Sequence, residues 1–319
     1  MRQEKTMEKR ILVGFDGSER SMRAVDYVGF MFQNRKDIHL TILYLMNPLP
    51  ALPKEQDISL RHKLHQQKER LEKERKERAG AAFERAKEVL IRKNIPEDRF
   101  TVKAEFQKLG KARDLLSIAE KGNSFDAVVV GRRGLGAFTK MFAGSVSIEL
   151  VRMQKEIPAV VVGNVIESKK VLIAMDDSEN SLQAVDYASF ILGNDPEVQF
   201  TLFSALPSLQ TMLGEGISCE INELEKCYQS DEERQMNESF ARAEKIFSDA
   251  GVEYARIKTK IKKKSFNIAK DIYEEAKRGG YGTVVLGRKG RTGLKGIVMG
   301  SVSLKSLALI EDRAVWIVG

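Results

Sequence analysis

Short apolar runs alternate with longer segments of mixed character along the whole chain. Each run is rich in Val, Ile and Leu and ends near a glycine, a proline or a charged residue, as buried strands of a parallel sheet do. We predict strands at residues 11–15, 40–46, 100–106, 127–130 and 159–162, and again at 171–175, 198–204, 254–262, 283–286 and 315–318.

The segments between these runs carry apolar residues at helical spacing. Ala24, Val25 and Val28 share one face of a helix that Ser18 or Ser21 would cap, and the same pattern follows Ser178. Further helices are predicted at residues 79–90, 112–121, 145–153, 240–247, 267–278 and 301–309. Because strand and helix alternate throughout, the fold class is α/β with doubly wound parallel sheets.

The chain is an internal duplication. The series Asp16, Ser18, Ser21 and Ala-Val-Asp-Tyr27 returns at the same spacing from Asp176 to Tyr187. A repeat of this length indicates a pair of domains and is far too long for a solenoid. We expect a polar tail at residues 1–9, a first domain at 10–163, a linker at 164–169 and a second domain at 170–319.

A charged arm at about residues 54–93 interrupts the first domain. Within it, residues 59–78 have only Leu60, Leu64 and Leu71 to anchor them, so we expect an extended, partly exposed helix. The net charge of +8 owes much to this arm. Its basic residues are interleaved with glutamates, and the basic tract at 260–264 carries no interleaved aromatic residues. We therefore expect no nucleic-acid partner.

Several classes of protein are excluded by composition. No run approaches the length of a membrane span, and residues 1–9 have no apolar core that would mark a secretory signal. Two cysteines form no disulfide framework, and His62 and His65 lie on a charged helix, where a solvated face is favoured over a metal site. We expect a cytoplasmic protein with no membrane partner and no structural metal.

A glycine motif occurs once in each half and carries the chemistry. Gly131 and Gly134 are followed, after nine residues, by Gly144 and Ser145, and the second copy has the same spacing, at Gly287, Gly290, Gly300 and Ser301. Each copy follows a predicted strand and precedes a helix, which is the arrangement of a phosphate cradle. Ser145 and Ser301 would be the helix N-caps. The spacing matches neither a Walker A loop nor a Rossmann fingerprint.

An acidic residue ends the first strand of each half. Ligands of open parallel sheets bind beyond the carboxyl ends of the strands where the strand order reverses, so Asp16 would face the Gly131 loop and Asp176 the Gly287 loop. A carboxylate there would repel phosphates and would suit the ribose or base end of a nucleotide. The simpler alternative is that both aspartates only cap the next turn.

These motifs resemble the universal stress protein family in a tandem, two-domain form. The resemblance implies an adenine nucleotide α-hydrolase-like fold with sheets ordered 3-2-1-4-5. It also implies binding of ATP or a related adenine nucleotide, and Mg²⁺ would accompany ATP. The resemblance further implies fifth-strand pairing inside the chain, and a homodimer remains open. The nucleotide-binding residues it implies are Gly14, Asp16, Leu45, Val130, Gly131, Gly134, Gly144, Ser145 and Val146, and Ala174, Asp176, Ala205, Leu286, Gly287, Gly290, Gly300, Ser301 and Val302.

The second half departs from the first at two of these places. Gly14 and Gly17 become Ala174 and Asp177, which adds bulk and negative charge near the expected base. Pro158, which opens the fifth strand, becomes Ala314. The first change would weaken binding in the second half, so we expect unequal occupancy.

The leading function is a nucleotide-binding stress-response or regulatory protein whose nucleotide state controls conformation or binding of a protein partner. Arg132, Arg133, Arg288 and Lys289 would neutralise phosphate charge, but no carboxylate or histidine adjoins either loop, so we assign no catalytic residue and expect at most weak ATP hydrolysis. The alternatives are a slow ATPase or nucleotide hydrolase, and a nucleotide-free scaffold that uses the charged arm.

Overall fold

The computed structural model describes residues 8–51, 58–121, 124–132, 146–154, 157–164, 166–213, 222–291 and 299–319. They form two compact units, one ending at Gly131 and the other beginning at Arg132. The division therefore falls before the last helix and strand of the first sequence repeat, whereas the predicted linker lies at 164–169.

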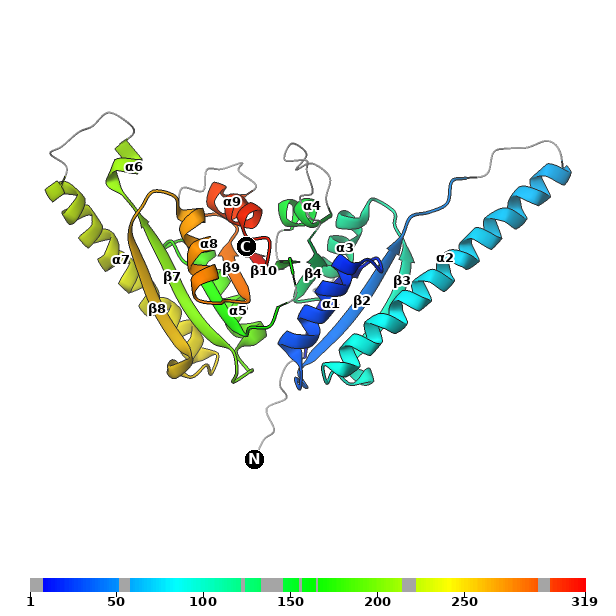
Figure 1. Ribbon diagram of the computed structural model, residues 1–319, viewed down its shortest axis with the longest axis horizontal. Helices are drawn as coiled ribbons and strands as arrows, with labels where there is room; N and C mark the ends of the chain where they lie inside the picture. The colour runs from blue at the N-terminus through cyan, green and yellow to red at the C-terminus, as the bar shows by residue number, and fades with distance from the viewer. Residues whose placement is uncertain are drawn as a thin grey trace. The chain divides into compact units, whose positions relative to one another are not determined.

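The first unit is a parallel sheet with helices between its strands (Figure 1). Its strand order is β3-β2-β1-β4, which is the order predicted for the first four strands of a repeat. Its elements are β1 (Lys9–Phe15), α1 (Glu19–Phe32), β2 (Ile38–Met46), α2 (Ile58–Arg92), a 3₁₀ turn (Glu97–Arg99), β3 (Phe100–Phe106), α3 (Lys111–Glu120) and β4 (Ala127–Gly131).

The second unit holds the whole second repeat and the end of the first. Its sheet has the order β5-β10-β9-β6-β7-β8, so the second repeat shows the complete predicted order 3-2-1-4-5. Its elements are α4 (Val146–Met153), β5 (Ala159–Val162), β6 (Lys170–Ala174), α5 (Glu179–Leu192), β7 (Gln199–Pro207), α6 (Leu209–Leu213), α7 (Asn222–Asp249), a 3₁₀ turn (Tyr254–Arg256), β8 (Ile257–Ser265), α8 (Ile268–Arg278), β9 (Thr283–Gly287), α9 (Ser301–Leu309) and β10 (Ala314–Val318).

The two fifth strands meet within the second unit. β5 pairs with β10 in the antiparallel direction, with Val162 opposite Ala314 and Ala159 opposite Ile317. Pairing of the fifth strands inside the chain is what the family resemblance implies. Trp316 on β10 is almost fully buried, so the seam between the strands is also part of the hydrophobic core.

The central strands are apolar on both faces, as strands of a parallel sheet covered by helices are. β4, β5 and β9 are built from Val, Ala and Leu side chains that are buried almost completely. The helices that follow the first strands begin where predicted. Ser18 and Ser178 are the N-caps, and each hydroxyl accepts a hydrogen bond from the backbone N–H three residues later.

The charged arm is a continuous part of α2. The helix is 35 residues long, and its C-terminal half packs into the first unit through Ala79, Phe83 and Ala86. Towards its N-terminal end Leu60 and Leu71 stay 43% and 49% exposed. The predicted long and partly exposed helix is therefore correct, and its apolar contact is confined to the half that carries the regular stripe.

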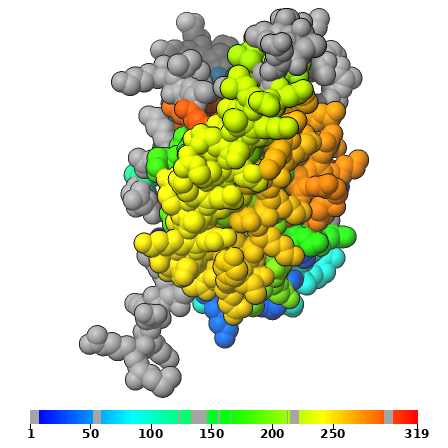
Figure 2. Space-filling view, turned by 90° about the vertical axis from the view of Figure 1, so that its left-hand side faces the viewer, coloured from blue at the N-terminus to red at the C-terminus, as the bar shows by residue number. Residues whose placement is uncertain are grey.

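The basic tract at residues 260–264 lies in the edge strand β8, whose exposed face is flanked by α7 and α8 (Figure 2). Lys260 forms an ion pair with Glu275 at 2.6 Å, and Lys263 forms one with Glu233 at 2.6 Å. Lys262 pairs with Asp271 in the same way. Neighbouring acids thus pair with three lysines of the tract, and a lysine-rich edge also discourages pairing with another sheet.

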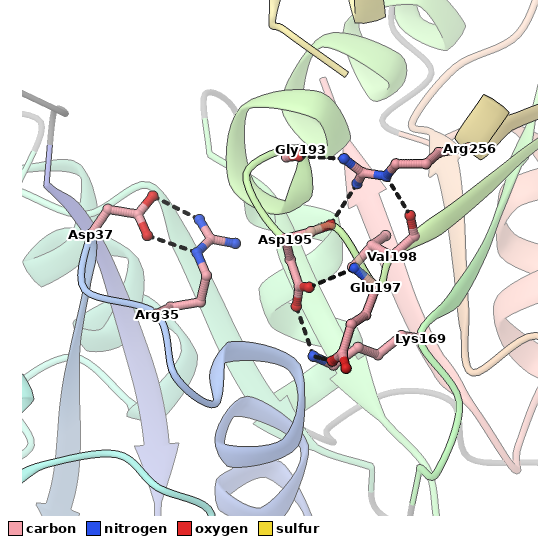
Figure 3. A network of polar contacts seen from close by, with 8 residues as sticks. All are labelled: Arg35, Asp37, Lys169, Gly193, Asp195, Glu197, Val198 and Arg256. Atoms are coloured by element: carbon pink, nitrogen blue, oxygen red, sulfur yellow. Dashed lines mark hydrogen bonds and ion pairs between the residues drawn. The ribbon is translucent and has the colours of Figure 1, made fainter. Parts of the chain in front are cut away.

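Charged side chains fasten the turn after the first helix of each repeat. In the first unit Arg35 makes two hydrogen bonds of 2.7 Å to Asp37 (Figure 3). In the second unit Arg256 donates to the carbonyl oxygens of Gly193, Asp195 and Val198 at 2.9, 2.6 and 2.9 Å. Arg256 is only 7% exposed, so these carbonyls have little access to water.

We predict that Arg256→Met lowers the free energy of unfolding of the second unit by about 3 kcal/mol, because three backbone acceptors lose their donor in a buried place. Chemical denaturation followed by circular dichroism measures the change. The equivalent Arg99 is 27% exposed and pairs with Glu8, which is 45% exposed, so Arg99→Met should cost less than about 1 kcal/mol. Equal losses in the two variants would contradict this account of the turn.

Candidate functional site

The second unit contains a cavity of about 260 Å³ at the carboxyl ends of β6, β7 and β9. β6 lies between β7 and β9 in the sheet. The chain passes from β6 to β7 on one side, and after β8 it returns to form β9 on the other side. This reversal of strand order opens a crevice at the sheet edge, which is where ligands of such sheets bind.

All nine positions predicted for the second repeat line this cavity. They are Ala174, Asp176, Ala205, Leu286, Gly287, Gly290, Gly300, Ser301 and Val302. They come from three strand ends, the glycine loop and the start of α9. The sequence pattern therefore identifies one continuous surface, and whether that surface binds a nucleotide stays a prediction.

The glycine loop runs so close to its surroundings that side chains do not fit. A Cβ atom at Gly290 would lie 2.4 Å from Oδ2 of Asp176, and one at Gly287 would lie 2.9 Å from the carbonyl oxygen of Asn180. Asp176 in turn accepts a hydrogen bond of 3.2 Å from the backbone N–H of Arg291. The end of β6 and the loop after β9 thus form one wall of the cavity.

Both aspartates also cap the turn that follows them, as the simpler interpretation expects. The backbone N–H of Ser18 donates to Asp16 at 3.1 Å, and that of Ser178 donates to Asp176 at 3.3 Å. Burial raises the pKa of Asp16, but hydrogen bonds from Ser18 and Ser21 outweigh it and hold the pKa below its usual value. Capping and ligand contact use different lone pairs, so one role does not exclude the other.

Helix α9 begins at the mouth of the cavity. Gly300 is its N-cap and Ser301 is its first helical residue, so the expectation that Ser301 caps the helix is wrong. The hydroxyl of Ser303 donates to the carbonyl of Gly287 at 2.7 Å, which fastens the helix start to the loop. Ser301 is exposed and lines the cavity, and the free N–H groups of the first turn favour an anion there.

Arg288 does not face the cavity as a phosphate-binding residue, contrary to the sequence-based expectation. Its guanidinium donates to the carbonyl of Arg152 at 2.8 Å and to that of Gln154, at the C-terminal end of α4. Arg132 does the same at the end of α9, donating to Leu307 and Ile310 at 2.6 Å. Both pairs lie in the second unit, where the two arginines hold the helices beside the β5–β10 seam and complement their C-terminal dipoles.

Asp177, which stands where the first repeat has Gly17, also does not face the cavity. It has φ of +59°, close to the +74° of Gly17, so the backbone of the turn is the same in both repeats. Its carboxylate accepts hydrogen bonds from Ser239 and Arg242 on α7 and does not line the cavity. The added charge is therefore paired with a cation of α7, and the expected penalty for a nucleotide base is not supported by this geometry.

The first repeat is described only in part. Gly14, Asp16 and Leu45 lie at the carboxyl ends of β1 and β2, Val130 and Gly131 end β4, and Val146 begins α4 in the second unit. Gly134, Gly144 and Ser145 lie outside the described residues, as does Arg133.

The strand ends of the two repeats are filled differently. In the first unit the rings of Phe15, Tyr44 and Phe83 pack together, with centroids 6.1 to 6.2 Å apart. The positions of Phe15 and Tyr44 correspond to Met175 and Ser204, which line the cavity of the second repeat. Smaller side chains there leave room that an aromatic cluster fills in the first unit.

Several cavity residues have no motif that would identify them in the sequence. Glu232 and Met236 reach the cavity from α7, Ile268 and Ile272 from α8, and Phe203 from β7. The apolar residues among them follow the periodicity of core residues, which does not show that they border a cavity, and Glu232 has no distinguishing neighbour in the sequence. Lys289, Arg291 and Ser303, which also line the cavity, lie within or beside the glycine motif.

Among the described residues, no group of three or more His, Cys, Asp or Glu side chains has the arrangement of a metal site. Within the same ranges no helix is both long and apolar enough to cross a membrane.

Comparison with known proteins agrees with the fold. The universal stress protein family model matches residues 7–162 and again residues 167–309. A universal stress protein from Archaeoglobus fulgidus superposes with a TM-score of 0.58 at 18% identity, covering 97% of each chain. A functionally unknown protein from Pseudomonas aeruginosa PAO1 has a TM-score of 0.55 at 14% identity, covering 98% of this chain and 92% of that one.

A universal stress protein solved in complex with cAMP is a more distant match. It covers 48% of this chain and 96% of its own, at 21% identity and a TM-score of 0.36, which is too low to transfer its ligand. No curated protein sequence matches the chain significantly.

The structure is thus a pair of adenine nucleotide α-hydrolase-like α/β repeats. The chain belongs to the universal stress protein family, in its tandem form.

We predict that Arg288→Met destabilises the second unit by about 2 kcal/mol, because the carbonyls at the end of α4 lose a charged donor. Thermal and denaturant unfolding measure this loss. The adjacent Lys289 lines the cavity, and its side chain makes no hydrogen bond to another described residue, so Lys289→Met should change stability by less than about 0.5 kcal/mol. A larger effect at Lys289 than at Arg288 would overturn the assignment.

Proposed function

We propose that this protein binds an adenine nucleotide in the cavity of its second repeat and serves as a stress-response or regulatory protein in the cytoplasm. The observation that carries the proposal is the convergence of the nine motif positions on one cavity at the strand-order reversal. Family membership adds support, because the motif that gathers there is the one that the sequence shares with the family.

The two ends of the cavity suit the two ends of a nucleotide. The apolar side chains Phe203, Ala205, Leu206 and Ile272 offer a surface for a flat base. The glycine loop and the first turn of α9 offer close backbone approach and N–H donors for phosphate. Asp176 lies between these two groups of residues, where a ribose hydroxyl would donate to it. Mg²⁺ would accompany ATP through the phosphates, with no dedicated protein cage.

We expect binding with at most weak hydrolysis. The carboxylates at the cavity are already engaged, since Asp176 accepts from Ser178 and Arg291, and Glu232 pairs with Arg291 at 2.8 Å. A carboxylate that is held by cations and donors is a poor base for activating water. The nucleotide would then act by stabilising one conformation for a partner.

The exposed part of α2 is the proposed contact for a protein partner. Leu60 and Leu71 are exposed among charged residues of both signs, which gives apolar contact area with an electrostatic rim. The same feature supports the scaffold alternative, which requires no nucleotide at all. Nucleotide binding by the purified chain separates the two.

We predict that Gly290→Ala weakens ATP binding to the second repeat at least about tenfold. The new methyl group would occupy the place of the Asp176 carboxylate and displace either that side chain or the loop. Isothermal titration calorimetry with ATP and ADP measures the loss as a weaker affinity or as one fewer site per chain.

Gly80→Ala is the matched control. Gly80 lies within α2, and nothing lies within 4 Å of a Cβ placed there, so alanine should leave nucleotide binding unchanged and raise helix stability by up to about 1 kcal/mol. If the purified chain releases no nucleotide on denaturation and then binds neither ATP nor ADP, the proposed function is wrong and the scaffold alternative stands.

A further inference from the structure

The basic residues of the second glycine loop are not equally available to a phosphate. The loop and its edges hold Arg288, Lys289 and Arg291 among the described residues. The Arg288 guanidinium is committed to carbonyl groups at the end of α4. Among the described residues of the loop, Lys289 and Arg291 are therefore the cations that a ligand in the cavity would meet, since both line it.

Arg291 already has an anionic partner at the cavity. Its guanidinium lies 2.8 Å from a carboxylate oxygen of Glu232 on α7, while its backbone N–H donates to Asp176. The Glu232 side chain is only 12% exposed, so the pair is weakly screened by solvent. Burial lowers the pKa of Arg291, but the hydrogen bond and the charge of Glu232 outweigh burial and hold that pKa above its usual value.

The pair is peculiar to the second repeat. The spacing that relates Phe83 to Phe240 places Arg75 at the position of Glu232. In the glycine motif, Leu135 takes the place of Arg291. Neither residue of the pair is thus shared by the first repeat, although the glycines themselves are identical. Where the phosphates would lie, the two repeats therefore differ in the charges of these two positions.

We propose that Glu232, through its ion pair with Arg291, is the specificity-determining residue of the second site and makes it discriminate against ligands with long phosphate chains. This rests on the proposed function. To bind Arg291, a triphosphate must break the ion pair between Arg291 and Glu232. Its negative charge would then lie next to the unpaired Glu232 carboxylate. Adenosine leaves the pair intact, because it has no phosphate and places no negative charge at the loop.

The test compares ATP and adenosine binding to the full-length protein, using hydrogen exchange of peptides that cover residues 286–306 as the readout of second-site occupancy. Glu232→Gln keeps the shape of the side chain and removes its charge. We expect its ATP affinity to rise about tenfold and its adenosine affinity to stay within about twofold, since one charge-assisted bond no longer competes. Unchanged adenosine binding also shows that the variant is folded.

Glu233→Gln is the matched control. Glu233 is the next residue of α7, carries the same charge and pairs with Lys263 at 2.6 Å, but it does not line the cavity. It should leave the ratio of the two affinities unchanged. The inference is overturned if Glu232→Gln leaves that ratio unchanged, lowers it, or alters it no more than Glu233→Gln does. If the wild-type second repeat binds neither ligand, the proposed function itself fails, which is a distinct result.

Discussion

The close approach of Gly290 to Asp176 is the constraint on which the second-repeat site depends. At this point the loop after β9 crosses the end of β6 with no room for a side chain. The approach requires β6 and β9 to be neighbours, which they are because the strand order reverses at β6. The strand order, Gly290 and the Asp176 carboxylate are therefore all needed for this contact, and losing any one of them would separate the end of β6 from the loop after β9.

Several contacts hold the described start of the loop, at residues 287–291, beside the wall. Ser303 fastens the start of α9 to Gly287, and the carbonyl of Lys289 accepts a hydrogen bond from the side chain of Asn180 at 3.2 Å. Arg288 joins the same loop to the end of α4. The described residues at the start of the loop are thus tied to three helices of the second unit, α4, α5 and α9. Backbone that is held in this way loses little conformational entropy on binding a ligand.

Local patterns predicted the fold well because each element carries its own signal. The alternating apolar runs located the strands, and Ser18 and Ser178 marked the helix starts. The duplicated glycine motif located the loop that lines the cavity, because its glycines stand where the backbone approaches its neighbours closely. The remaining lining positions, such as Ala205 and Leu286, were implied by the family resemblance. The strand order came from the family resemblance, because periodicity alone does not fix which strands are neighbours.

The parts that could not be predicted depend on long side chains from distant segments. Arg288 looks like a phosphate ligand in the sequence, yet it binds the end of α4, more than a hundred residues earlier. Glu232 and Arg291 are paired although they lie on different elements and are 59 residues apart, and Asp177 is neutralised by Arg242, 65 residues later. The sequence shows that a loop contains charged residues, but tertiary packing decides which way each charged side chain points.

A crystal structure of the full chain grown with saturating ADP would test the central claim most directly. The account predicts electron density for the nucleotide in the second-repeat cavity, with the base against Phe203 and Ile272 and the phosphates at the Gly287–Gly290 loop and the start of α9. Density for ADP at another place, or an empty cavity in crystals whose protein binds ADP in solution, would contradict it.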